Sequence, residues 1–120
     1  MSTATDRQGV NNEVSFKPPV RAGTTGAITL SGLQTVDGVV LNADDRVLVK
    51  NQADQKTNGI YSAQTGPWLR TLDCNGNRDI VKGTLVFVNE GSTLVRTMWT
   101  VTSSDPILID TTNITWVQFI

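Results

Sequence analysis

Short runs of alternating hydrophobic and polar residues, separated by turn residues, dominate the pattern along this chain. Ile28 and Leu30 alternate with Thr29 and Ser31, and Gly32 ends the run. Alternation over a few residues is typical of a strand with one buried face, whereas a helix would repeat its apolar positions every three or four residues. The pattern therefore predicts a strand here and a β structure beyond it.

A turn and a second strand follow. Asp37 and Gly38 predict a turn, because Gly adopts positive φ without steric cost and Asp tolerates the neighbouring position. The strand predicted at 46–50 places Val47 and Val49 on a buried face and its other side chains on a half-exposed face.

Two hairpins are predicted next. The first pairs residues 60–63 with 68–72 around a loop that contains Gly and Pro. The second pairs residues 84–88 with 94–101 around a short loop at 89–92. Asn58 and Gly59, where positive φ again comes easily, open the first of these hairpins.

Two predicted strands are apolar on both faces. Within 84–88, Leu85 and Phe87 point one way while Val86 and Val88 point the other. The last strand, at 114–119, has the same property, and a further short strand is predicted at 107–109. A strand that is apolar on both faces is either central in a sheet or lies at a subunit contact.

We therefore predict an all-β fold, a small antiparallel β-sandwich or barrel of about eight short strands. Gly, Thr, Asn and β-branched residues oppose helices almost everywhere. Two regions are expected: an extended polar N-terminal arm at 1–23 and the β module at 24–120.

The predicted arm has two interpretations. It has few residues to bury, namely Val10, Val14, Phe16 and Val20, and alone it would be extended or disordered. The arm is either a flexible leader or a segment that becomes ordered by packing against a neighbouring subunit or a larger particle. In the second interpretation Phe16 is its apolar anchor.

Composition excludes several functional classes. The chain has 120 residues, a net charge of -1 and a pI of about 5.2, with both signs of charge interspersed. No electropositive face is expected for nucleic acid. The first residues lack the basic and apolar regions of a signal peptide, and no apolar run approaches the roughly 18 residues that span a bilayer. We expect synthesis in a cytosol and no membrane anchor.

The residues also argue against catalysis, so we predict no enzyme, no cofactor and no metal. There is no histidine, and Cys74 is the only cysteine, expected to be an ordinary free thiol. A pair of carboxylates could hydrolyse a glycoside, and Asp44 and Asp45 are the closest pair in the sequence. Adjacent residues on a strand point to opposite faces, so these two side chains are not expected to converge. Asp45 is expected to cap the turn or to pair with Arg46. The oxygen-rich stretch 73–79 lacks the Gly and the final Glu of a helix-loop-helix calcium motif, so a surface loop is expected.

The tryptophans leave two interpretations open. Trp68, Trp99 and Trp116 are expected to form the core, since a buried aromatic removes about 150 to 250 Å² from water. The alternative is a stacking platform for sugars. Under that alternative Trp68, beside a Gly-Pro turn, is the most exposed and the possible glycan contact, and Trp116 is the least exposed.

Taken in order, the motifs resemble one family. They are the runs at 28–32, 34–38, 45–52, 58–61, 83–88 and 114–119. From about residue 18 to the end, this series resembles the N-terminal domain of bacteriophage tail fibre and tailspike proteins. The resemblance implies a virion structural protein that connects a fibre to the particle, while receptor binding or polysaccharide cleavage lies in a distal part.

The resemblance also implies partners. Such fibres are homotrimers, so we expect contacts with further copies, with other phage tail or neck proteins, and with a host surface glycan only through a distal region. The residues expected at a subunit or virion interface are Phe16, Leu85, Phe87, Trp116, Val117 and Phe119. The alternatives are a short collar, neck or capsid-decorating protein, or a module that binds host glycan as a receptor.

Overall fold

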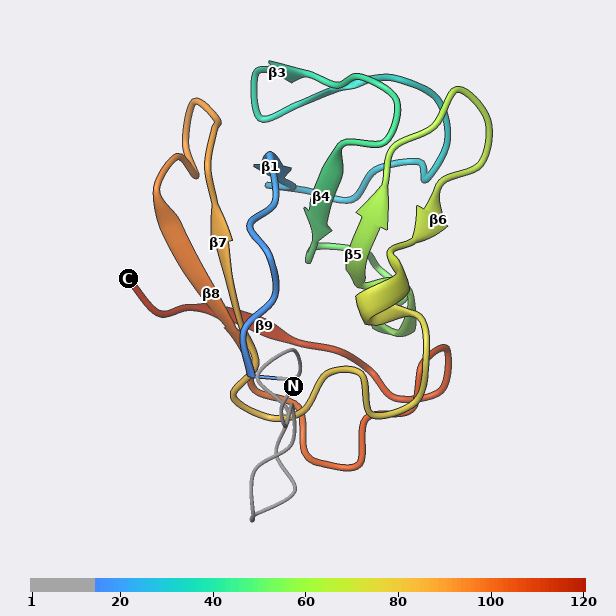
Figure 1. Cartoon of the computed structure of the whole chain (residues 1–120), viewed down its shortest axis with the longest axis vertical. Coiled ribbons are helices and arrows are strands. Elements are labelled where there is room, and N and C mark those ends of the chain that lie inside the picture. The colour runs from blue at the N-terminus through green and yellow to red at the C-terminus, as the bar shows by residue number, and fades with distance from the viewer. Residues whose placement is uncertain (1–14) are drawn as a thin grey trace, which may run out of the picture.

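The computed structural model describes residues 15–120, and its regular structure over 16–120 is built almost entirely from short strands (Figure 1). The strands are β1 (Ala22–Gly23), β2 (Thr35–Val36), β3 (Val39–Val40), β4 (Arg46–Val49), β5 (Gly59–Ser62), β6 (Leu69–Arg70), β7 (Leu85–Val88), β8 (Thr97–Val101) and β9 (Trp116–Gln118). Two 3₁₀ helices, η1 (Gln55–Thr57) and η2 (Leu72–Cys74), accompany them. The all-β prediction is confirmed. The sheets are open, and none of them closes into a barrel among these residues.

The largest sheet has the order β1-β4-β5-β6. β4, β5 and β6 are antiparallel, as the first predicted hairpin requires, while β1 runs parallel to β4. β5 opens at Gly59 with φ 153, and the Arg70 side chain lies where a Cβ would be. The end of the strand predicted at 68–72 instead turns into η2.

A separate hairpin pairs β2 with β3 around the predicted turn. Asp37 and Gly38 have φ of 48 and 80, so both adopt the left-handed conformation for which these residue types are suited. The Asp37 carboxylate accepts hydrogen bonds from the backbone N–H groups of Thr93 and Leu94. The turn therefore also ties this hairpin to the loop between β7 and β8.

The third sheet has the order β7-β8-β9 and is antiparallel throughout. The prediction that the β7–β8 connection is a short loop at 89–92 was wrong, because β8 begins only at Thr97. Leu94 turns into the core, and Arg96 at φ 59 interrupts the extended backbone. The paired part of the predicted strand is thus confined to its second half.

Two predicted strands are absent. Residues 28–31 keep the predicted alternation of burial, but the Gln52 side chain, not a neighbouring strand, binds both backbone groups of Ile28. Residues 107–109 are also irregular, since side chains take their backbone N–H groups: Thr112 bonds Leu108, and Asn77 bonds Ile109. Polar side chains thus bind the backbone at Ile28, Leu108 and Ile109, while the first segment keeps a single bridge between Ser31 and Pro67.

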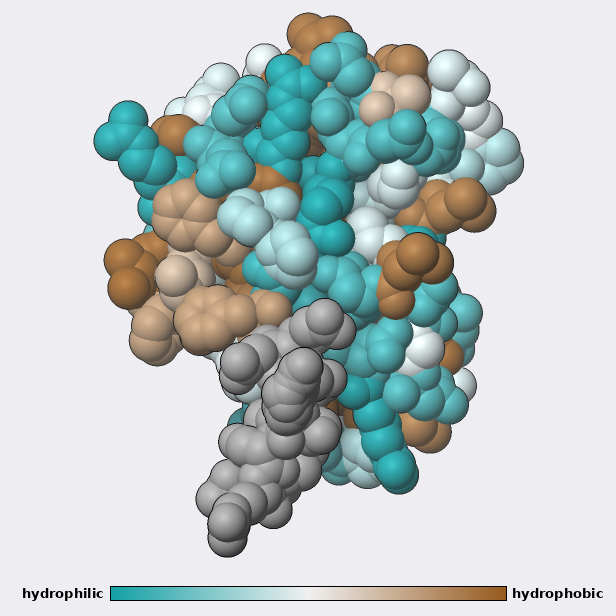
Figure 2. All heavy atoms as spheres, viewed as in Figure 1, coloured by the Kyte–Doolittle hydropathy of each residue, from teal (hydrophilic) through white to brown (hydrophobic). Residues whose placement is uncertain are grey.

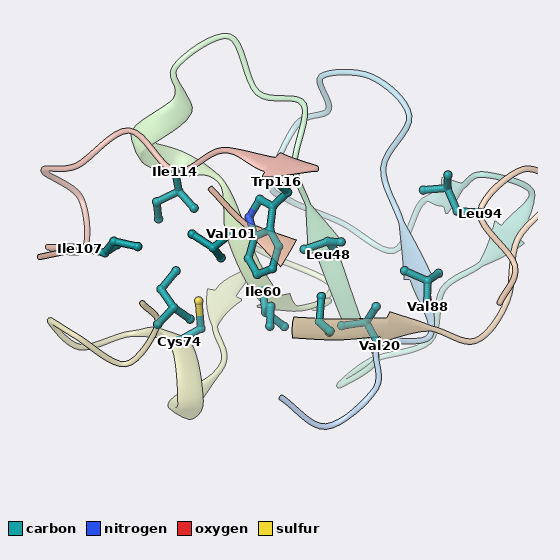
Figure 3. Packing of buried hydrophobic residues seen from close by; sticks show 12 residues of the cluster. Val20, Leu48, Ile60, Cys74, Val88, Leu94, Val101, Ile107, Ile114 and Trp116 are labelled. Atoms are coloured by element: carbon teal, nitrogen blue, oxygen red, sulfur yellow. The ribbon is translucent and has the colours of Figure 1, made fainter. Parts of the chain in front are cut away.

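β4 lies between two hydrophobic clusters, which corrects the expectation that one of its faces is half exposed. Val47 and Val49 pack in one cluster beneath the β2–β3 hairpin. Leu48, on the opposite face, is 0% exposed and packs in the other cluster with Ile60 and Val88 (Figure 3). β4 is therefore a central strand with both faces covered.

The described part of the predicted arm joins the first and third sheets (Figure 1). It first runs parallel to β7, where Lys17 N–H donates to Leu85 O, Val20 N–H to Phe87 O, and Asn89 N–H to Val20 O, at 2.9, 2.9 and 3.0 Å. It then runs parallel to β4, where Arg21 N–H donates to Arg46 O and Thr24 N–H to Leu48 O, at 2.8 and 2.9 Å. Residues 16–24 thus pack within the same folded unit as the module predicted at 24–120; residues 1–14 of the arm lie outside the described residues.

A matched pair of valine truncations tests the importance of this segment. Val20→Ala should lower the free energy of unfolding by about 1.5 to 3 kcal/mol, because Val20 is 0% exposed where the sheets meet. Val40→Ala, at a side chain 68% exposed, should change it by less than about 0.5 kcal/mol. Urea denaturation of both variants gives the comparison. Equal effects would contradict the central position of Val20.

Candidate functional site

Most residues predicted to lie at an interface share one face of the β7–β8–β9 sheet. Strand pairing places Leu85 beside Thr100 and Thr100 beside Val117, and residues paired in this way point to the same side. Two residues further along these strands, on the same side of the sheet, Phe87 lies beside Met98. This surface, the outer apolar face, consists of Phe16, Leu85, Phe87, Met98, Val117 and Phe119.

Much of the outer apolar face is in contact with water. Phe16, Val117 and Phe119 are 57%, 50% and 60% exposed. Figure 2 shows tan and brown side chains gathered over β7, β8 and β9. The strand residues of this face carry no charge, and Thr100 is the polar one among them. Such a surface favours contact with another apolar surface over contact with a polyanion or a sugar.

Sequence reasoning missed Met98 as a member of this face. The signal was present in the alternation of β8, where Met98 and Thr100 are out of phase with Trp99 and Val101. Only the pairing of β8 with both neighbours shows that this phase lies on the outer side.

Trp116 was wrongly predicted to lie at the interface. It points to the other side of the sheet, is 7% exposed and packs in the cluster around Val101 and Leu48 (Figure 3). Its indole Nε1 is buried and has no hydrogen-bond partner among the described residues. Trp116 is therefore a core residue, as the simpler interpretation of the tryptophans predicted.

The predicted order of tryptophan exposure was also wrong. Trp68 is 6% exposed, and its Nε1 donates to Gly32 O at 2.8 Å, because the turn beside it pairs with the segment that ends at Gly32. Trp99 is only half-buried, and the Lys50 ammonium lies 4.1 Å from its ring centre. Trp68 offers no open indole face to a sugar.

Arg46 fastens the arm to the β4–β5 sheet. Its guanidinium forms two hydrogen bonds of 3.1 Å with the Asp73 carboxylate and donates to the carbonyls of Pro18 and Pro19. Burial raises the pKa of Asp73, but hydrogen bonds from Arg46 and Thr71 outweigh it, so the net pKa lies below its usual value. The carboxylate therefore remains charged in the folded protein.

Lys17 forms a second attachment of the arm. Its side chain is 5% exposed, and its Nζ donates to Asp79 O at 2.7 Å. Burial lowers the pKa of this ammonium group, against the attraction of nearby Asp73. These cations hold the arm in place; sequence reasoning assigned no role to Lys17.

The carboxylates considered for catalysis do not converge. Asp45 caps the turn by accepting from Asn42 N–H, as predicted, but it pairs with Arg21 at 2.7 Å and not with Arg46. Asp44 accepts from the Gln64 amide. A shallow hollow of about 500 Å³ lies here, lined by Asp44, Arg46, Ser62, Gln64, Leu69, Arg70, Thr71, Leu72 and Asp73. Its polar groups bond mainly to one another, which leaves few of them directed at a ligand.

The oxygen-rich loop is a turn held by its own carboxylate. Asp79 accepts from the backbone N–H groups of Asn75 and Gly76, at 3.1 and 2.7 Å. Within 15–120 no group of three or more Asp, Glu, His or Cys side chains could hold a metal ion. Cys74 is buried with a free thiol, and burial raises its pKa.

Comparisons with known proteins found no match: the chain matches no family model, no curated protein and no solved structure. The resemblance to phage fibre domains therefore remains a prediction from the motifs. In the described part of the chain, no helix is long and apolar enough to cross a bilayer.

Removing the Asp73 carboxylate should change the acid sensitivity of the fold. Because the folded-state pKa of Asp73 lies below its ordinary 3.8, its contribution is complete above about pH 5 and is lost as pH falls through the folded pKa. The difference in melting temperature between the wild type and Asp73→Asn should be largest near pH 6 and should shrink towards pH 2.

Thermal melts across this pH range test the effect, with Asp110→Asn as the control. Asp110 also pairs with an arginine, but its side chain is 75% exposed, so its substitution should have little effect at any pH. A difference for Asp73→Asn that stays constant with pH would rule out ionisation as its cause.

Proposed function

We propose that this chain is a non-enzymatic structural component of a bacteriophage virion, the particle-proximal attachment domain of a tail fibre or tailspike. The observation that carries the proposal is the outer apolar face, an uncharged surface that gathers the predicted interface residues other than Trp116. A surface of this kind is a contact site for other protein subunits.

The ordered series of motifs supports the virion assignment, since it resembles phage fibre domains from about residue 18 to the end. The chemistry of the side chains supports a structural role. The chain contains no histidine, and Asp45, Asp73 and Asp79 are engaged in ion pairs or turn caps. These groups hold the fold together.

The proposed partners are two further copies of the chain, which the resemblance implies form a homotrimer with it, and other tail or neck proteins. The three exposed side chains Phe16, Val117 and Phe119 supply on the order of 300 Å² of apolar surface. A stable interface buries about 800 Å² on each partner. The outer apolar face therefore needs additional surface from its surroundings to form a lasting contact.

A short collar, neck or capsid-decorating protein would use the same face and would differ in its place on the particle. The glycan-receptor alternative has less support, because Trp68, the indole proposed to meet a sugar, is buried.

Quantitative peptide mapping of purified particles of the encoding phage tests the assignment. We expect peptides of this chain in the particles, in a copy number divisible by three, and we expect them to be lost from tail-stripped particles. Mock-purified lysate is the control for contamination. Complete absence from the particles would overturn the virion assignment, and retention on tail-stripped capsids would favour a decoration protein.

Matched serine substitutions in the phage test the role of the face. Val117→Ser, on the outer apolar face, should reduce incorporation of the chain into particles several-fold, since it removes apolar contact area. Val40→Ser changes another exposed strand valine away from this face and should leave incorporation unchanged. Equal incorporation of both variants, measured per particle, would contradict the assembly role of the face.

A further inference from the structure

β9 forms an open edge of the third sheet. It is last in the order β7-β8-β9, and among the described residues no strand pairs with its outer side (Figure 1). The opposite end of this sheet is covered, because the segment that starts at Phe16 bonds to β7. Within residues 15–120, the edge of the third sheet at β7 is therefore covered and the edge at β9 is open to a partner.

The hydrogen-bond pattern identifies the free backbone groups. Thr115 O accepts from Thr102 N–H at 3.0 Å, and Phe119 N–H donates to Met98 O at 2.7 Å, so these positions face β8. Since alternate residues of an antiparallel strand face opposite edges, the backbone groups of Trp116 and Gln118 face outward. Those are the positions available to another strand.

The open stretch has a definite start. Ile114 faces the same outer edge, but its N–H donates to Gln55 O at 3.0 Å and its carbonyl accepts from the Asn58 amide at 2.8 Å. The described loop around η1 thus covers the edge at Ile114. The open stretch ends at Gln118, because Ile120 O accepts from Met98 N–H at 2.9 Å and Ile120 N–H donates to Met98 O at 3.4 Å. Gln118 and Val117 are exposed there.

The side chains of this edge lack the charges and the Pro that often prevent strand addition. Proteins protect exposed edges with charged side chains, Pro or inward-pointing charges, and also with short strands and β-bulges. β9 has only three residues, and Met98 O accepts from the N–H groups of both Phe119 and Ile120, as at a β-bulge, so its protection lies in its length and not in its side chains. Residues 114–120 contain no charged residue, no Pro and no Gly. Val117 and Phe119 are also half or more exposed on the outer side of the strand. An uncharged edge of this composition can add a strand over the short stretch Trp116–Gln118.

We infer that β9 pairs with β9 of a second copy of this chain, antiparallel and across a two-fold axis near Val117. Two identical edges are self-complementary in this arrangement. The outward backbone N–H and C=O groups of Trp116 bond to those of Gln118 of the partner subunit, and the two-fold axis repeats the same bonds between Gln118 and the partner's Trp116. No charged side chain lies at the axis to oppose its own copy. The pairing joins the third sheets into one and brings the outer apolar faces side by side.

This inference goes beyond the proposed function and does not rest on it, because the pairing belongs to the isolated chain. A two-fold contact predicts even-numbered association. Trimers formed through the outer apolar face would be joined in pairs by the same edge. The contact is short and buries less than a standard interface, so we expect association in the micromolar range.

Sedimentation velocity of the full chain over a concentration series tests the pairing. We expect a reversible even-numbered species for the wild type and for Gln118→Ala. We expect Gln118→Pro to weaken association at least tenfold, because Pro removes an outward N–H without removing a bond to β8. Thermal melts check that the proline variant is folded. A concentration-independent monomer, or an odd-numbered species alone, would overturn the inference.

Disulfide trapping gives a second measurement that does not depend on the proline variant. Val117→Cys should form a covalent dimer on mild oxidation, since the Cβ atoms of the two introduced cysteines would lie close together at the axis. Thr100→Cys, beside it on β8 but away from the edge, should not. The native Cys74 is 0% exposed and should not contribute. Trapping of Thr100→Cys as efficiently as Val117→Cys would show face-to-face packing and overturn the edge pairing.

Discussion

The structure depends on one segment, residues 16–24, which is hydrogen bonded first to β7 and then to β4. These parallel pairings link parts of the chain that are far apart in sequence, so neither sheet can form them from its local hairpins. Val20 lies fully buried where the segment passes from one sheet to the other. Backbone bonds and apolar contact act together at this point, and Arg46 and Lys17 fasten the segment from outside.

The position of this segment decides the role of its neighbours. Because it covers one edge of β4, that strand is central in its sheet, with Leu48 facing one hydrophobic cluster and Val47 the other. Because it covers the edge of β7, the third sheet has its open edge at β9 in the part of the chain that the structure describes. The apolar side chains that the core does not use are left on the outer side of that sheet, near this edge.

The charged groups are mostly engaged in holding loops and the arm. Asp73 binds Arg46, Asp45 binds Arg21, and Asp37 caps the loop before β8. Ion pairs of this half-exposed kind add modest stability, but they fix geometry that the short strands alone would leave loose. Among the described residues, the outer apolar face and the β9 edge are surfaces that the intrachain contacts leave without a partner. These surfaces are the ones on which the proposed role in assembly depends.

The sequence by itself determined the local features: the β class, the Asp37-Gly38 turn, and the apolar character of both faces of β7. Period-two alternation and positive φ are properties of neighbouring residues, so they can be read along the chain. Only the tertiary structure decided which surface each feature meets. Trp68 is buried because the turn beside it pairs with the distant segment that ends at Gly32. That segment forms a single bridge and no longer strand, since the Gln52 side chain binds the backbone of Ile28. Trp116 faces the core because of its pairing phase with β8. These outcomes depend on contacts between residues far apart in sequence, which no local pattern specifies.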